Sequence, residues 1–299
     1  MASSFTPVDL SQLPAPQAVE PLDFEAIFSA MLADLRARAP EFDALLESDP
    51  AYKVLEVAAY REVLIRQRVN DGAKAVMLAY ATGADLDQLG ALFGVSRLLI
   101  GAGDDTVIPP IPPTYEADRD FRRRIQLSLE GYSTAGPVKA YQYHALSADP
   151  DVLDASVLSE TPGDVLVSVL SRTGDGTAPA SLIAAVDALL SSDDVRPLTD
   201  IVTVRGATIQ NYAVLATLYF HSGPDRSVVM VQAQEAIEAY TAAQLRLGHD
   251  VTLSGIYAAL HQPGVSRVEL TAPTASILID KKTAAYCTAI TLTDGGVDE

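Results

Sequence analysis

Apolar residues in the first half of the chain recur every three or four positions, which is the spacing of one face of a helix. The first such stripe follows Asp23, a residue type suited to the N-cap position, and Pro40 closes it. Its members are Phe24, Ile27, Phe28, Met31 and Leu35. The spacing predicts a helix between Asp23 and Pro40.

A second, longer helix is predicted from about Tyr52 to Tyr80, and at about 1.5 Å per residue it would be roughly 40 Å long. Its apolar face is expected to carry Tyr60, Val63, Leu64, Val69, Ala73, Val76, Met77 and Tyr80. A short helix follows, because Thr82 and Asp85 form a T-x-x-D capping pattern and Gly94 stands where that helix would end.

Prolines mark two segments of the first half as irregular. Residues 101–115 hold four prolines and two glycines, so neither a helix nor a central strand can form there, and we place a linker or an inserted loop at this point. Residues 1–22 contain four more prolines and are predicted to be an extended arm. Such an arm lies on a neighbouring subunit or is a loose terminus, and the sequence leaves both readings open.

Another helix is predicted over residues 118–130, with Asp118 as its N-cap and Gly131 at its end. Its inner face is expected to consist of Phe121, Ile125 and Leu129, with Arg122, Arg123 and Arg124 outside or beside that face. The segment 133–137 would break the chain and start a new helix at Pro137.

After residue 150 the pattern changes to alternating or β-branched runs separated by helical stripes. Strands are predicted over 152–158, 165–170, 200–205, 212–220 and 265–270, and helices over 179–191, 228–245 and 253–260. The tail, 275–299, holds two short strand-like pieces, 277–279 and 287–292. A strand in this tail could pair with a neighbour's sheet edge or serve as an edge strand of its own module.

The sequence therefore predicts a multi-domain α+β fold, with a helical N-terminal half followed by two small α/β modules. The expected divisions are an extended Pro-rich arm (1–22), a helical domain with its loop at 101–115 (23–150), a first α/β module (151–205), a second α/β module (206–274) and a C-terminal tail (275–299).

Charge and composition exclude several classes of function. The 299 residues contain 21 Lys and Arg against 39 Asp and Glu, a formal net charge of −18, so the overall field repels nucleic acid and anionic membranes. No apolar run approaches the roughly 20 residues that a membrane span needs. The single cysteine, Cys287, permits neither an intrachain disulfide nor a cysteine-rich metal site.

Sequence patterns typical of catalysis or cofactor binding do not emerge. There is no P-loop, no G-x-G-x-x-G turn between a strand and a helix, and no G-x-S-x-G nucleophile elbow. The four histidines, His144, His221, His249 and His261, never stand at the i, i+4 spacing of a helical metal site. We therefore expect no catalytic, cofactor-binding or metal-binding residues, and no cofactor.

Three weaker candidates have simpler interpretations. The pairs Asp104-Asp105 and Asp193-Asp194 could serve glycoside hydrolysis, but adjacent carboxylates usually point apart. The segment Gly174–Thr177 resembles an ion-binding loop, yet it is more simply a connection between a strand and a helix. The run Arg122–Arg124 could bind phosphate, although carboxylates of the chain itself or of a protein partner are the better expectation.

Three stretches give the chain a family resemblance. They are YREVLIRQRVNDGAKAVMLAYATGADLDQLGALFG (60–94), DFRRRIQLSLEGYSTAGPVKAYQYHAL (120–146), and DDVRPLTD (193–200) together with LHQPGVSRVEL (260–270). In this order they resemble the baseplate assembly protein J family of contractile-tailed phages and of phage-tail-like bacteriocins (tailocins, pyocins).

The resemblance implies a structural protein of the virion tail baseplate, assembled in the host cytoplasm, and not an enzyme. Proteins of this family form part of the baseplate wedge around the tail hub and spike region. The implied partners are a W-like sheath initiator, a tail protein of the I type, and copies of the chain itself. The helical half would join neighbouring subunits in a bundle, the α/β half would contact copies of itself, and the ring would rearrange on contraction.

Two alternatives from other classes remain at the level of sequence. One is a glycan hydrolase of the phage particle that uses paired carboxylates, and the other is a fibre-attachment adaptor. Cell-wall digestion would favour the hydrolase, and a peripheral position in the particle would favour the adaptor.

Overall fold

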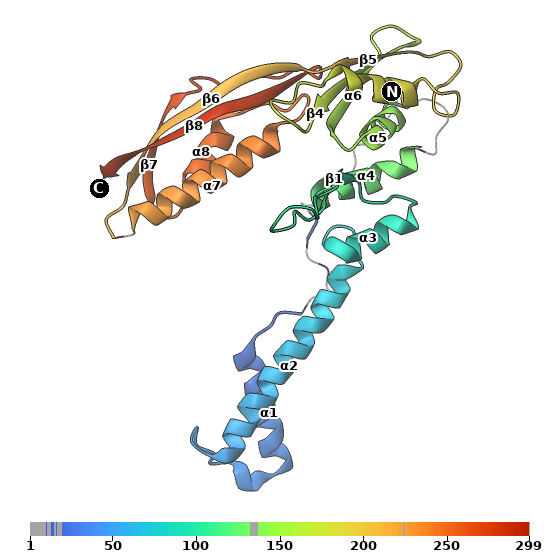
Figure 1. Ribbon diagram of the computed structural model, residues 1–299. Helices are drawn as coiled ribbons and strands as arrows, with labels where there is room; N and C mark the ends of the chain where they lie inside the picture. The colour runs from blue at the N-terminus through green and yellow to red at the C-terminus, as the bar shows by residue number, and fades with distance from the viewer. Residues whose placement is uncertain are drawn as a thin grey trace. The chain divides into compact units, whose positions relative to one another are not determined.

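The computed structural model describes residues 10, 13, 14, 16, 20–131, 137–223 and 225–298. These residues form two compact units (Figure 1). The first unit contains the described residues up to Arg97 together with Ala117–Ile125, and the second contains Leu98–Glu116 and the described residues from Gln126 onward. The predicted α+β class is confirmed: helices dominate the N-terminal half, and two small α/β modules follow.

The first unit is built on two packed helices, α1 (Phe24–Arg38) and α2 (Pro50–Ala75), joined through a short 3-10 turn at Pro40–Phe42. The predicted N-cap is confirmed, because the Asp23 carboxylate accepts a hydrogen bond from the Ala26 amide at 3.0 Å. Ile27 and Phe28 of α1 pack against Ala59 of α2 and form the centre of this contact. The helix pair is thus held by one narrow apolar seam.

The predicted course of the long helix was wrong at its C-terminal end and in the face that it buries. Helix α2 ends at Ala75, and the chain turns through residues 76–80. Val63 faces α1, whereas Tyr60 and Val69 are more than half exposed. Apolar residues lie on two sides of α2, and α1 packs against only one of these sides.

The described part of the N-terminal arm lies along α2 of the same chain. The Asn70 side-chain amide donates to the Glu20 carbonyl at 2.9 Å and accepts from the Glu20 amide at 3.0 Å. Arg66 forms an ion pair with the Glu20 carboxylate at 3.3 Å, and the Tyr80 hydroxyl donates to the Leu13 carbonyl. Much of the predicted arm falls outside the described residues, so its full course stays a prediction.

Helix α3 (Gly83–Leu92) packs against the first turns of α4 (Asp118–Gly131). The predicted Thr82 cap does not form, because the Thr82 side chain makes no capping hydrogen bond. The Asp118 carboxylate accepts the Gly83 amide at 3.1 Å instead. A residue 35 positions away therefore supplies the cap that local sequence was expected to provide.

Gly90 marks the closest contact between these two helices. A Cβ at this position would lie 2.5 Å from the Phe121 ring and 2.8 Å from the Val95 carbonyl oxygen. We expect Gly90→Ala to lower the free energy of unfolding by about 1–3 kcal/mol, because the helices would have to separate or Phe121 would have to leave its rotamer.

Gly72 in α2 is the matched control, because a Cβ there meets nothing within 4 Å. Gly72→Ala should raise the free energy of unfolding by about 0.5–1 kcal/mol through helix propensity. Denaturant titration followed by circular dichroism measures both values. Equal effects of the two substitutions would contradict the tight contact at Gly90.

The second unit begins with a two-stranded hairpin between β1 (Leu99–Gly101) and β2 (Thr114–Tyr115). The segment was predicted as an irregular linker or loop, and its ends instead pair as antiparallel strands. Beyond the strands, Asp104 and Ile111 exchange two backbone hydrogen bonds of 2.8 and 2.9 Å. The prolines fit this hairpin because they lie in the connection between the two strands, where no backbone N–H is needed for strand pairing.

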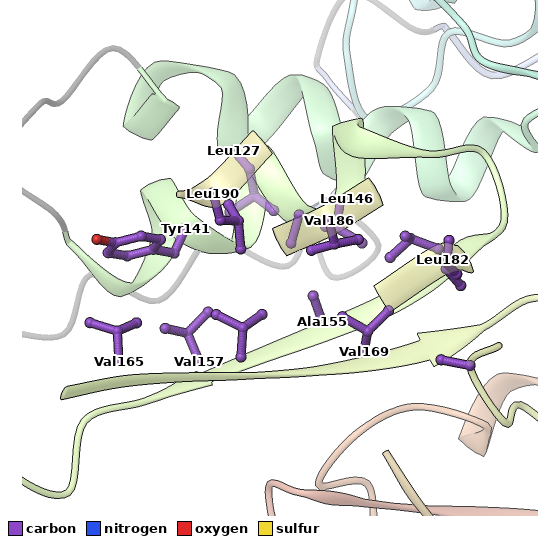
Figure 2. Packing of buried hydrophobic residues seen from close by; sticks show 14 residues of the cluster. Leu127, Tyr141, Leu146, Ala155, Val157, Val165, Val169, Leu182, Val186 and Leu190 are labelled. Carbon is purple, nitrogen blue, oxygen red and sulfur yellow. The ribbon is translucent and has the colours of Figure 1, made fainter. Parts of the chain in front are cut away.

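The first α/β module contains a three-stranded sheet of order β3-β4-β5, with bounds Val152–Leu158, Asp164–Ser171 and Ile201–Gly206. Strands β3 and β4 form the predicted antiparallel hairpin, and β5 runs parallel to β4 after a crossover through α6 (Ala180–Leu190). Helices α5 (Val138–Ala148) and α6 cover one face of the sheet. Figure 2 shows Tyr141, Leu146, Val186 and Leu190 of these helices pointing toward Val157 and Val169 of the strands.

The second α/β module contains a sheet of order β7-β6-β8, with bounds Val265–Ala272, Thr208–Phe220 and Thr283–Val297. Helices α7 (Arg226–Gln244) and α8 (Leu253–Leu260) lie on one face of it (Figure 1). The tail was predicted as two short strands, but residues 283–297 form one long strand parallel to β6. The reading of this tail as an edge strand of its own module is confirmed for residues 283–297.

Candidate functional site

The histidines lie apart from one another. His144 on α5 is half-buried and packs against Tyr143 at 5.4 Å between ring centroids. Burial lowers the pKa of His144, and a hydrogen bond with the Gly131 backbone only partly opposes that shift. His221, His249 and His261 are exposed in connections between elements. Across residues 20–131, 137–223 and 225–298, no three His, Cys, Asp or Glu side chains gather closely enough to hold a metal ion.

The paired candidate carboxylates are exposed, Asp175 is partly exposed, and Asp104 and Asp175 each accept a hydrogen bond within their own loop. Asp104 accepts from the Thr106 amide at 2.8 Å, and Asp175 accepts from the Thr177 amide at 2.9 Å. These bonds lower the pKa of Asp104 and of Asp175, so both carboxylates stay ionised. The pair 193–194 lies exposed in the turn after α6. The lowered pKa of Asp104 and of Asp175 is the opposite of the raised pKa that a catalytic acid requires.

The loop 174–177 connects β4 to α6, as predicted. An open depression of about 520 Å³ beside α7 is lined by Gln232, Glu235, Ala236, Gln262 and Pro263. It offers one carboxylate and no second titratable group for acid–base chemistry. Cys287 is partly buried on β8, and burial raises the pKa of its thiol, which disfavours a reactive thiolate.

The arginine run was expected to meet carboxylates of the chain itself or of a protein partner, and two of its members also bind backbone carbonyl oxygens. Arg122 donates to the Leu78 and Ala81 carbonyl oxygens at 2.6 and 2.7 Å. Arg124 is only 5% exposed and donates to the Ser96 carbonyl oxygen at 2.6 Å. These carbonyls belong to the turn after α2 and to the chain after α3. The guanidinium groups therefore tie the irregular ends of other elements to α4.

Arg97 completes this arrangement, which we call the arginine latch (Arg97, Arg122 and Arg124). Its guanidinium pairs with Asp87 at 2.8 Å and Asp118 at 2.7 Å, and lies 4.8 Å from the centre of the Phe121 ring. Partial burial raises the pKa of Asp118, but the Gly83 amide and Arg97 outweigh it, and the net shift is downward. The three guanidinium groups of the latch thus bind carboxylates and backbone carbonyl oxygens of the same chain.

Leu129 was also expected on the inner face of α4, and it is 63% exposed. Leu127 is buried in its place and joins the core of the first α/β module. The predicted inner face was right for Phe121 and Ile125 and wrong for Leu129, because the buried side of α4 changes along its length.

Hydrogen bonds, an ion pair and apolar contacts join the two α/β modules. We call the residues that form them the module junction (Leu153, Asp154, Glu160, Arg246, Leu247 and Lys282). Arg246 is 8% exposed and donates to the Leu153 carbonyl oxygen at 2.5 Å. The Leu247 amide donates to the buried Asp154 carboxylate at 3.0 Å, and Lys282 pairs with Glu160. Leu170, Leu247 and Ala284 form a small apolar cluster beside these bonds.

Two unusually apolar surfaces are left uncovered in the described structure. One is the side of α2 opposite α1, which we call the outer face (Val54, Val57, Ala58, Leu64, Ile65 and Val69). The other is the hairpin of residues 98–116, which we call the finger, where Ile108 is 99% exposed. Exposed apolar groups gathered in this way mark surfaces that contact other proteins. No described helix is both long and apolar enough to cross a membrane.

Comparison with known proteins yields three domain matches along the chain. The Baseplate J-like N-terminal domain matches residues 47–104, the Baseplate J-like central domain matches 133–206, and the Baseplate J-like protein C-terminal domain matches 212–293. Together they cover more than half of the sequence.

A curated relative, Baseplate protein J of Escherichia phage P2, is 49% identical over 299 residues, which is 98% of this chain and 99% of the relative. Among solved structures, the chain is similar to a chain in the baseplate of the anti-feeding prophage. That match has 13% identity and a TM-score of 0.40, and covers 61% of this chain and 43% of the other.

Proposed function

Because this chain belongs to the baseplate J family, we propose that it is a structural subunit of a contractile-tail baseplate and that it has no catalytic activity. The observation that carries the proposal is the near full-length similarity to Baseplate protein J, since it includes both the helical half and the two α/β modules. A relative that aligns over its entire length shares the architecture through which a structural subunit acts.

The exposed surfaces support this role. A chain that acted alone would gain nothing from the uncovered outer face of α2 or from an apolar finger, and both would favour aggregation. In an assembly, the same surfaces become buried contacts. The residues weighed as catalytic candidates are dispersed, exposed or used in internal hydrogen bonds, which agrees with a protein that works by binding.

In finer detail, we propose a wedge subunit that lies in the ring around the tail hub, in a phage or a phage-tail-like bacteriocin. Its proposed partners are a W-like sheath initiator, an I-type tail protein and copies of itself. The helical unit would contact neighbouring wedge proteins, the α/β modules would contact copies of the chain, and the ring would rearrange on contraction. The proposed location is the virion tail baseplate, after assembly in the host cytoplasm.

Co-expression with the W-like and I-type proteins of the same gene cluster tests this proposal. We expect one heteromeric complex on size-exclusion chromatography, because the exposed apolar surfaces should be covered by partners. Leu198→Glu is a suitable control, because Leu198 is a 96% exposed side chain that belongs neither to the outer face nor to the finger, and its change should leave the complex intact. A monomer in every mixture, or cell-wall digestion by the purified chain, would contradict the proposal.

A further inference from the structure

We propose that the finger of one copy of this chain packs against the outer face of α2 in a second copy. The inference rests on the proposed self-association of the subunit and names a specific contact for it. It follows from four properties of these two surfaces: fixed shape, apolar composition, opposite charge and limited area.

The finger is held in one conformation before any partner binds. Leu99 pairs with Tyr115, and Asp104 pairs with Ile111 through both of its backbone groups. Gly103 has a φ of +73°, and a Cβ there would meet the Ile111 carbonyl oxygen at 2.4 Å, so the two arms of the hairpin touch backbone to backbone. A preformed projection loses little conformational entropy on docking.

The finger exposes apolar side chains from base to tip. They are Leu99 (45%), Ile100 (39%), Val107 (37%), Ile108 (99%), Ile111 (54%) and Tyr115 (55%). Its charge has one sign, because residues 98–116 contain Asp104, Asp105 and Glu116 and no Lys or Arg. Glu116 is buried, so the exposed charges of the finger are the two aspartates.

The outer face of α2 has the complementary character. Val54, Val57, Ile65 and Val69 are each more than 60% exposed there. Helical geometry places Arg61 and Arg68 among them, two turns apart and about 10 Å from each other along the axis. Both are exposed, and neither takes part in an ion pair among the residues that the structure describes. The sector between Val57 and Val69 thus presents apolar groups and positive charge.

Charge favours a contact between a finger and an outer face over a contact between two outer faces or between two fingers. Two outer faces packed together would oppose arginines, and two fingers would oppose aspartates, whereas a finger on an outer face brings opposite charges together. The chain carries a net charge of −18, so copies repel one another over most of their surfaces, and a locally positive face is a favourable place for an acidic element. Contacts of this heterologous type close into rings when the rotation permits.

The area of the finger limits the strength of this contact. Six partly exposed side chains offer less than the ~800 Å² that each partner buries in a standard stable interface. The contact should therefore form when copies are already held near each other, as they would be in a wedge complex, and should be weak between free chains.

Disulfide trapping between two single-cysteine chains tests the contact. Both chains carry Cys287→Ala; one also carries Ile108→Cys and a size tag, and the other carries Ile65→Cys. After mixing, or in the co-expressed complex, mild oxidation should give a mixed disulfide at least about tenfold faster than the control pair Leu198→Cys with Ile65→Cys. Leu198 is a matched control, since it is an apolar side chain of nearly equal exposure.

Three outcomes would overturn the inference. The first is a rate of disulfide formation equal to that of the control pair, and the second is faster disulfide formation between two Ile65→Cys chains than between the Ile108→Cys and Ile65→Cys chains. The third is a disulfide within one chain when that chain carries both cysteines. Charge exchange gives a second measure. Asp105→Arg in the finger chain should lower the yield about fivefold, and Arg61→Asp with Arg68→Asp in the other chain should restore it. Absence of restoration would also overturn the inference.

These results separate the inference from the proposed function. If the cross-link fails while the chain still enters a complex with the W-like and I-type proteins, the finger contact is wrong and the structural role stands. If no complex forms under any condition, the proposed function itself is wrong.

Discussion

Replacing Arg124 by alanine is expected to lower the free energy of unfolding of the helical unit by about 2–4 kcal/mol. Arg124 is almost fully buried, donates to the Ser96 carbonyl oxygen and lies 5.8 Å from the centre of the Phe121 ring. Its removal takes a hydrogen-bond donor from the Ser96 carbonyl oxygen and leaves a void beside the buried Phe121 ring. Denaturant titration followed by circular dichroism measures the loss.

Arg119→Ala is the control for this substitution, because Arg119 lies on the same helix and is exposed. It should change the free energy of unfolding by less than about 0.5 kcal/mol. If Arg124→Ala and Arg119→Ala behave alike, the arginine latch does not stabilise the unit. Arg124→Lys should recover only a small part of the loss, because an ammonium group lacks the planar fork of donors that a guanidinium offers.

Replacing Arg246 by alanine is expected to uncouple the two α/β modules and to lower their combined stability by about 2–4 kcal/mol. The buried Arg246 side chain donates to the carbonyl oxygen of Leu153, which lies 93 positions earlier in the chain. The amide of the following residue, Leu247, donates to the Asp154 carboxylate. Without the guanidinium, the carbonyl oxygen of the partly buried Leu153 loses this donor. Calorimetry should show a single transition for the two α/β modules in the parent protein and separate transitions for them in the variant.

Arg226→Ala is the control for this substitution, because Arg226 on α7 forms its ion pair within the second α/β module and not at the module junction. Arg226 pairs with Asp294 at 3.1 Å, but both side chains are more than 40% exposed. Solvent screens such pairs, so this change should cost less than about 1 kcal/mol and leave a single transition. A single transition for Arg246→Ala as well would mean that the apolar cluster around Leu247 couples the modules without the arginine.

The elements of the fold follow from local sequence, and most of them could be predicted. Helix α1 begins after Asp23 and helix α8 spans residues 253–260, as their caps and apolar stripes indicate. The hairpin of β3 and β4 follows from two β-branched runs around a Pro-Gly turn. These predictions succeed because caps, turns and side-chain periodicity act over a few residues, within reach of a local pattern.

The division of the chain into an arm, a helical domain, two modules and a tail stays a prediction, as does the expected absence of catalytic, cofactor and metal residues. Candidate chemistry was judged from spacing alone, and spacing cannot show whether distant carboxylates converge. The family resemblance came from long ordered stretches and was confirmed by the three domain matches.

The sequence by itself determined most of the helices and strands, the α+β class and the family, because these depend on short-range periodicity or on long similar runs. The tertiary structure alone decided which side of α2 is covered, that Arg122 and Arg124 bind backbone carbonyls, and that β8 pairs with β6. A helix with two apolar sides gives no local sign of which side its neighbour takes. Likewise, an arginine finds a carbonyl 28 or more residues away only after the chain has packed.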